Sequence, residues 1–237
     1  MTNLTPPTDC QDCPAWKKSL FRDFPPDLIQ WITERKKIVA LNKKDSLFKQ
    51  GDAVEGIYCH LSGLGKVVQK DAEGNVRFSR LVFPGDTSGH RSLFIETNYK
   101  ATAEVLSEHL QACYIPKEDI LHLLSHNASF AKNLVIKISN ELLRSEEEHI
   151  SAKERTVRGR LAELLSELCE AYSQQLNDNR ILINADITKV EIASFLSVAH
   201  ETVIRLMSEM KADGLISFQG KKIIVNDLDK LQATAKL

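Results

Sequence analysis

The sequence predicts an α+β protein with a strand-rich N-terminal half and a mainly helical C-terminal half. Between residues 38 and 115, short apolar and β-branched runs alternate with glycine-containing turns, which is typical of a barrel or sandwich. A long helical pattern follows, and then two short helices, a tight turn and a β-hairpin. Two short helices followed by a hairpin form a winged helix-turn-helix.

The composition is that of an ordinary globular protein. The chain has 237 residues, enough for one large or two modest domains, and its net charge is −1. No apolar run approaches the roughly 18 residues of a membrane span, and the N-terminus lacks the order of a secretory signal. Five cysteines at uneven spacing argue against a secreted disulfide framework, so we expect a cytoplasmic protein.

Residues 1–35 are predicted to form a cysteine-bearing arm, with a Cys-x-x-Cys at Cys10 and Cys13, and then a helix that begins at Pro25-Pro26. Residues 36–116 form the strand-rich domain. Its expected strands are Ile38–Leu41, Ser46–Phe48, Ile57–Leu61, Lys66–Gln69, Val76–Leu81, Ala101–Leu106 and Leu110–Ile115.

A helical region is expected over residues 117–154, with a short helix at Asp119–Leu124 and a long one from Ala128 to about Ser151. The long helix carries near-heptad positions that need a partner. These are Phe130, Leu134, Ile138, Leu142 and Ser145. The stripe either packs on the strand domain or forms the seam of a two-fold dimer.

Residues 155–237 are predicted to be the winged helix-turn-helix domain. We expect a helix at Arg155–Tyr172, a loop at Ser173–Arg180, a strand at Ile181–Ile183 and a closing helix in the tail. Thr188 and Glu191 have the spacing of a capping box, which predicts that the first helix of the motif starts there. Its predicted apolar side consists of Val190, Ile192, Ala193 and Leu196.

The second helix of the motif is predicted at Ala199–Lys211, with Gly214 ending it and strands at Leu215–Phe218 and Ile223–Val225. Its inward positions are Val203, Leu206, Met207 and Met210, and its outward positions are His200, Glu201, Ile204, Arg205 and Ser208.

The chemistry of the outward positions suits base recognition. Arg205 can donate to guanine, Glu201 can accept from cytosine, and Ile204 can pack on a thymine methyl group. His200 reaches a base or a phosphate, and Thr202 a phosphate. The alternative is that Glu201 and Arg205 form only a surface ion pair.

The run His200–Arg205, HETVIR, resembles the recognition helix of the CRP/FNR family of bacterial transcription regulators. LFKQGD, GIYCHLSGLGKV and LVFPGD are similar to the jelly-roll sensor domain of cyclic-nucleotide-binding folds. The resemblance implies a homodimeric regulator that binds inverted-repeat, double-stranded DNA, contacts RNA polymerase and uses the long helix as its dimer interface. No nucleophile–base pair, HExxH or phosphate loop indicates an enzyme.

The sensed signal depends on which family residues are present. Members that bind cyclic AMP carry a Gly-Glu pair and an Arg-Ser pair, whereas this chain has Gly89-His90 and Lys100-Ala101. Since the ribose acceptor is missing, we do not expect cyclic AMP to bind.

Similarity to the FNR-like branch implies a 4Fe–4S cluster, because Cys10, Cys13 and Cys113 match three of its four cysteine positions. Ser19 stands six residues after the Cys-x-x-Cys, where no cysteine is present. Cys59 is a candidate replacement, although a small buried core residue is its simpler interpretation. Oxygen ligands from Asp9, Asp12 or Asp23 are a further alternative.

Other sensors use some of the same residues. A thiol–disulfide switch would join Cys10 to Cys13, or either to Cys113, and would benefit from the depressed pKa common in Cys-x-x-Cys pairs. Haem bound through His60, His90 or a cysteine, or another small effector in the roll, also fits. Cys169 is expected to be a buried core residue.

Overall fold

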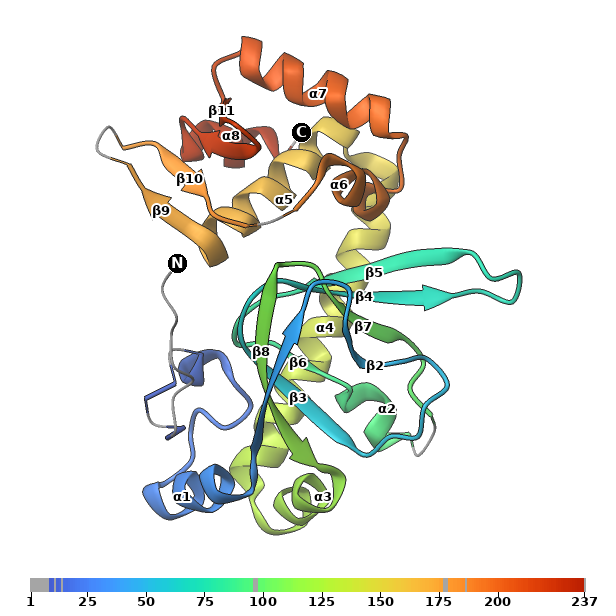
Figure 1. The fold of residues 1–237 in the computed structure, drawn as a ribbon, viewed down its shortest axis with the longest axis vertical. Coiled ribbons are helices and arrows are strands. Elements are labelled where there is room, and N and C mark those ends of the chain that lie inside the picture. Colours follow the sequence, from blue (N-terminus) through green and yellow to red (C-terminus); the bar gives the residue numbers. More distant parts are fainter. Residues whose placement is uncertain are drawn as a thin grey trace. The chain divides into compact units, whose positions relative to one another are not determined.

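The computed structural model describes residues 9–10, 12–13, 15–95, 98–176, 179–185 and 187–236. The chain divides into two compact units, Met1–Leu143 and Arg144–Leu237 (Figure 1). Helix α4 (Ala128–Glu154) begins in unit 1 and ends in unit 2. Within the described residues, every helix is too short or too polar to cross a membrane.

Unit 1 is built around a roll of two four-stranded antiparallel sheets. The sheet orders are β1-β8-β3-β6 and β2-β7-β4-β5. The strands are β1 (Lys37–Asn42), β2 (Ser46–Phe48), β3 (Gly56–Ser62), β4 (Gly65–Lys70), β5 (Val76–Val82), β6 (Thr87–Ser88), β7 (Thr102–Val105) and β8 (His109–Pro116). All seven strands predicted for this region are confirmed, and β6 is an addition.

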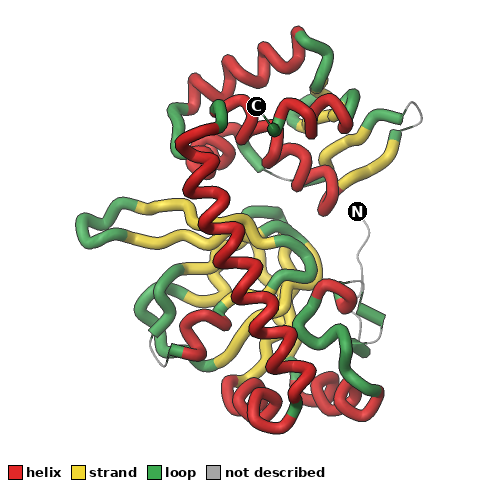
Figure 2. Tube along the Cα trace, turned by 180° about the vertical axis from the view of Figure 1, so that it is seen from behind, coloured by secondary structure: helices red, strands yellow, loops and turns green. Residues whose placement is uncertain are grey.

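Helices cover the outer face of the first sheet. They are η1 (Trp16–Lys18), α1 (Pro26–Arg35), α3 (Lys117–His126) and the first part of α4, which Figure 2 shows lying across the strands. One core joins the arm, α1, the outer face of β3 and β8, α3 and α4. The short helix α2 (His90–Phe94), which was not predicted, follows Gly89 at a φ of 86°.

Unit 2 is a helical domain with a four-stranded sheet ordered β11-β12-β10-β9. Its elements are α5 (Val157–Tyr172), β9 (Ser173–Gln175), β10 (Ile181–Ile183), α6 (Lys189–Leu196), α7 (His200–Ala212), β11 (Ile216–Gln219), β12 (Lys222–Val225) and α8 (Leu228–Thr234). Leu161, Leu164 and Leu165 of α5 are fully buried in it.

Local chemistry explains how the helix-turn-helix begins and ends. Thr188 accepts from the Glu191 N–H while the Glu191 carboxylate accepts from the Thr188 N–H, which confirms the capping box. Ser197, at a φ of 55°, makes the turn. After α7, Gly214 is left-handed, and the Leu215 N–H reaches the Met210 carbonyl in a Schellman arrangement.

Two expectations were wrong in detail, and the structure divides a third feature into two parts. Ser173–Gln175, predicted as loop, pairs with β10 as an edge strand, because backbone pairing needs no apolar side chain. Val190, predicted to face inward, is 60% exposed, whereas Ile192 and Ala193 of the same helix are buried. The predicted α4 stripe is divided: Phe130 and Leu134 are buried against unit 1, whereas Ile138 and Leu142 are exposed.

Candidate functional site

Four cysteines line one small cavity in unit 1. The cavity has a volume of about 30 Å³, and its walls include Cys10, Cys13, Cys59 and Cys113. Two thiols come from the arm and two from the outer face of the β1-β8-β3-β6 sheet. All four cysteines are free thiols. The walls of one cavity therefore include the three cysteines identified by the family resemblance and the candidate fourth.

The strand register places the sheet pair. Cys59 of β3 is the direct antiparallel partner of Cys113 of β8, so both side chains leave the sheet on the same face. Directly opposed residues have Cβ atoms about 4.5–5.5 Å apart. Cys59 is therefore a neighbour of Cys113 by backbone geometry, although the two lie far apart in the sequence.

Backbone hydrogen bonds hold the arm pair in place. The Cys13 N–H donates to the Cys10 carbonyl at 3.2 Å, and the Trp16 N–H donates to the Cys13 carbonyl at 2.9 Å. The Cys10 N–H donates to Thr33 Oγ1 of α1 at 3.2 Å. These bonds fold the Cys-x-x-Cys into a tight turn anchored on α1.

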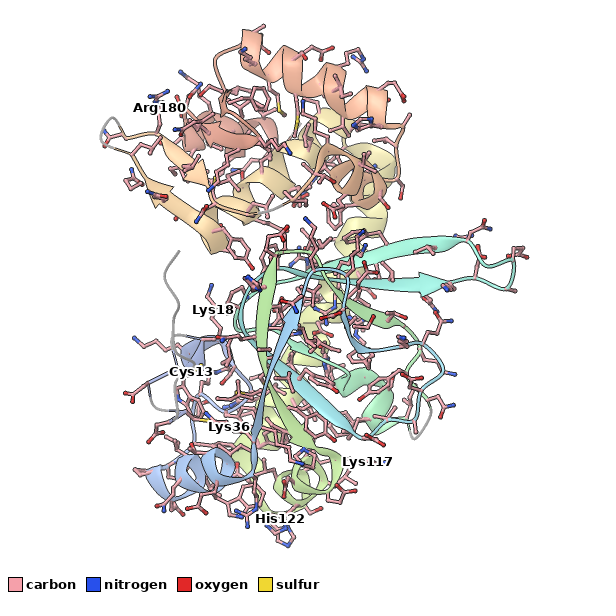
Figure 3. All side chains as sticks on the ribbon, in the orientation of Figure 1. Cys13, Lys18, Lys36, Lys117, His122 and Arg180 are labelled. Atoms are coloured by element: carbon pink, nitrogen blue, oxygen red, sulfur yellow. The ribbon has the colours of Figure 1, made fainter. Side chains whose placement is uncertain are left out.

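Burial makes the metal-free thiols weak acids. Desolvation raises the pKa of Cys113 to about 11 and that of Cys59 to about 12. Desolvation also raises the pKa of Cys13, which contradicts the depressed value expected for the Cys-x-x-Cys. Lys36 lines the cavity just after α1, and Figure 3 labels it together with Cys13. Its positive charge lowers the pKa of Cys13 and of Cys113, which offsets part of the increase that burial causes.

Ser19 also lines the cavity, but its hydroxyl group is engaged locally. Ser19 Oγ donates to the Trp16 carbonyl at 2.8 Å and accepts from the Phe21 N–H at 3.2 Å. The proposed oxygen donors Asp9, Asp12 and Asp23 are not among the cavity walls in the described part of the chain. Among the candidates for a fourth ligand, Cys59 is the one with a thiol at the wall of the cavity.

The four thiols are spread around the cavity rather than drawn together. Across the described residues, no three His, Cys, Asp or Glu side chains form a group that would hold a single metal ion. The cavity is large enough for one or two water molecules. The chemistry of the donor set, four soft sulfur ligands, fits an iron–sulfur cluster.

Of the two histidines considered as haem ligands, His60 is among the residues that line the cavity and His90 is not, and both are in hydrogen-bonding positions. His60 Nε2 is 2.9 Å from Ser88 Oγ, and His90 Nε2 is 3.1 Å from Glu141 Oε2. Burial lowers the pKa of His60 to about 3 and also lowers the pKa of His90. The His60 imidazole is therefore neutral, and the Nε2 atoms of both histidines already have partners.

The arm that carries Cys10 and Cys13 packs directly on α4. Phe21 stacks on Phe130 at a centroid distance of 5.6 Å, and Phe24 meets the same ring edge-on at 6.1 Å. Buried Asn133 of α4 donates to the Leu20 carbonyl at 3.1 Å and accepts from Arg22 at 3.0 Å. Sequence reasoning missed these contacts; an asparagine within an apolar stripe was the available signal.

Unit 2 presents the outward face of α7 much as the sequence predicts. Val203, Leu206, Met207 and Met210 are buried, and Glu201, Ile204 and Arg205 are exposed. His200 and Thr202 are partly exposed at the first turn. Ala199 gives α7 no side-chain cap, because its methyl group cannot accept a hydrogen bond from the first turn of the helix.

Arg205 has a different ion-pair partner from the one considered in the sequence. Its guanidinium donates to Glu209 Oε1 at 2.6 Å, one turn towards the C-terminus, rather than pairing with Glu201. Glu209 also lies 4.0 Å from Arg158 of α5, which pairs with Asp213 at 2.6 Å. Arg205 therefore forms an i,i+4 ion pair on the exposed face, with Glu209 as its partner in place of Glu201.

Comparison with known proteins accounts for both units. The cyclic nucleotide-binding domain family matches residues 38–127, and the Crp-like helix-turn-helix domain family matches residues 159–234. The fold resembles that of FixK2 from Bradyrhizobium japonicum, with a TM-score of 0.73 at 17% identity over 84% of this chain and 96% of that one.

Two curated relatives are similar over nearly the whole chain. The anaerobic regulatory protein of Haemophilus influenzae is 28% identical over 94% of this chain and 86% of its own length. The fumarate and nitrate reduction regulatory protein of Salmonella typhimurium is 24% identical, over 95% of this chain and 90% of its own length. With a cyclic nucleotide-binding domain and a helix-turn-helix domain matched in this order, the chain belongs to the CRP/FNR family of DNA-binding transcription regulators, which are not enzymes.

Proposed function

We propose that this regulator responds to oxygen or redox state through a 4Fe–4S cluster held by Cys10, Cys13, Cys59 and Cys113. One observation carries the proposal: four free thiols from three separate segments line the same cavity. The similarity to the anaerobic regulatory protein of Haemophilus influenzae supports this proposal. Cys59 takes the role that the absent fourth cysteine has in the FNR-like branch.

A bound cluster would supply the oxygen-sensitive redox chemistry. The protein's part is to provide four thiolates, whose protons leave when metal binds, and a partly apolar wall of Trp16, Phe21 and Ile32 that limits access of water. The Lys36 ammonium group offsets part of the negative charge of the thiolates.

Cluster loading and the position of the arm are coupled in this proposal. Because the described thiols are not grouped as metal ligands in this structure, Cys10 and Cys13 must shift when a cluster binds. The same arm contacts Phe130 and Asn133 of α4, so its movement changes the packing of that helix. The state of the thiols is thereby linked to α4.

The opposite side of α4 is suited to a second copy of the chain. Val135, Ile138 and Leu142 are 62%, 41% and 59% exposed and recur at helical spacing. A parallel two-fold pairing of this face would bury it and set two α7 helices to read an inverted repeat, with half-sites about one helical turn apart. Leu142→Asp should therefore lower self-association in sedimentation, whereas Leu121→Asp, an exposed leucine on α3, should not.

DNA reading is assigned to the exposed side of α7. Arg205 donates to a guanine and Glu201 accepts from a cytosine, while Ile204 contacts a thymine methyl group. His200 and Thr202, at the first turn, are placed for a base edge or a phosphate. For base reading, Arg205 must release Glu209.

Cysteine variants test the cluster assignment. Wild type and Cys169→Ser, which removes a buried thiol of unit 2, should each bind about four iron and four sulfide per chain when purified without oxygen. Cys59→Ser should lose most of that iron. Adding Ser19→Cys to Cys59→Ser should restore it, because position 19 also lines the cavity. Full iron content in Cys59→Ser would exclude Cys59 as a ligand.

A second candidate is an iron-free thiol switch, favoured by the direct pairing of Cys59 with Cys113 across two strands. An oxidant such as hydrogen peroxide would join the two sulfurs and take up their protons as water. Their raised pKa values make this oxidation slow near neutral pH. Iron-free protein in which Cys59 and Cys113 become disulfide-bonded on oxidation would favour this candidate.

A further inference from the structure

A buried carboxylate in unit 1 is surrounded by nitrogen donors. Glu141 of α4 is 15% exposed. Its Oε2 lies 2.8 Å from Arg91 Nε and 3.1 Å from His90 Nε2, both from α2, and its Oε1 lies 3.1 Å from Lys137 Nζ. Two hydrogen bonds from α2 and an ion pair within α4 therefore meet at one carboxylate group.

The charges around this carboxylate keep it ionised. Burial alone would raise the pKa of Glu141, but the hydrogen bond from His90 and the charges of Lys137 and Arg80 hold it well below its usual value. Burial lowers the pKa of His90, and its Nε2 lies within hydrogen-bond distance of the carboxylate, which can only accept. The surroundings stabilise an anion, whichever molecule supplies it.

We propose that His90, Arg91 and Lys137 form a binding site for a small oxyanion, which the chain fills with its own Glu141 side chain. With Glu141 in the site, its hydrogen bonds to His90 and Arg91 connect α4 to α2. A free carboxylate or phosphate ion has the same acceptor chemistry as the Glu141 side chain and binds when that side chain is removed. This inference goes beyond the thiol site and depends on neither iron nor DNA.

Replacement of the tethered anion provides the first test. In the full chain, Glu141→Ala should have a lower Tm than wild type. Sodium acetate or phosphate, compared with sodium chloride at equal ionic strength, should then raise its Tm by about 3–6 °C at ten times the dissociation constant, and the effect should saturate. Wild type and Glu146→Ala, which removes an exposed carboxylate of the same helix, should show no such saturable rise.

The two anions distinguish what the site accepts. A rise with acetate alone identifies a carboxylate site, and a rise with phosphate identifies a phosphate-binding site. Equal shifts in Glu141→Ala, Glu146→Ala and wild type would overturn the proposal, because they would reflect general salt effects on folding.

Conservative variants provide a second test that does not depend on the alanine variant folding. Arg91 is 57% exposed at its side chain, so Arg91→Gln leaves the packing intact. Arg91→Gln should lower the Tm of the wild-type chain, and should lower it by less than half as much when Glu141→Gln is also present. Strictly additive losses would show that the two groups do not form one site.

Discussion

The contact between the arm and α4 can be tested by removing one ring. Phe130 is completely buried, stacks on Phe21 and meets Phe24 edge-on. Replacing a core phenylalanine by alanine costs about 3–5 kcal/mol, and each lost aromatic pair accounts for about 0.5–1.5 kcal/mol of that. We therefore expect Phe130→Ala to destabilise unit 1 by about 3–5 kcal/mol.

Intrinsic fluorescence during urea unfolding suits this measurement, because both tryptophans, Trp16 and Trp31, lie in unit 1. Lys132→Ala, which alters an exposed position on the same helix, is the control and should change stability by no more than about 0.5 kcal/mol. A loss below about 1 kcal/mol for Phe130→Ala, or an equal loss in the control, would refute the argument that this ring anchors the arm.

Three further predictions concern DNA reading, helix capping and pH. Arg205→Ala should weaken binding to the specific operator by about 1–3 kcal/mol in a gel-shift titration, and equal losses on specific and random DNA would contradict a base contact. Ala199→Ser should stabilise the protein by about 0.5–2 kcal/mol in thermal unfolding, because it supplies the cap that α7 lacks; an unchanged Tm would mean that the first turn needs no cap. The depressed pKa of Glu141 contributes stability above the usual carboxyl pKa of about 4.3, and this stability is lost as pH falls below it. The stability difference between wild type and Glu141→Gln should therefore be constant from pH 6 to 8 and shrink below about pH 4.3, and a constant difference throughout would contradict the assignment.

Elements defined by local chemistry could be predicted from the sequence. The capping box of Thr188 and Glu191, the left-handed Gly214 and the inward set of α7 depend on neighbours within a few positions. The strands of the roll were predictable because glycine turns separate them. Edge strand β9 was missed, since its polar residues pair only through the backbone with β10.

Features that depend on register and packing could not be predicted in the same way. Cys59 was one of several candidates for the fourth ligand, and only the alignment of β3 with β8 makes it a neighbour of Cys113. The α4 stripe looked uniform in sequence, although its first part packs on the arm and its later part is exposed. Arg205 had acidic residues one turn away on both sides, and the position of Arg158 on α5 distinguishes the environment of Glu209.

The account depends most directly on what the thiol cavity holds. The decisive measurement is an absorption spectrum of wild-type protein purified without oxygen, taken before and after exposure to air, with iron and sulfide assays. We predict broad visible absorption that bleaches in air, with about four iron and four sulfide per chain. A colourless, iron-free protein with unreactive thiols, or a sharp haem band, would contradict the account.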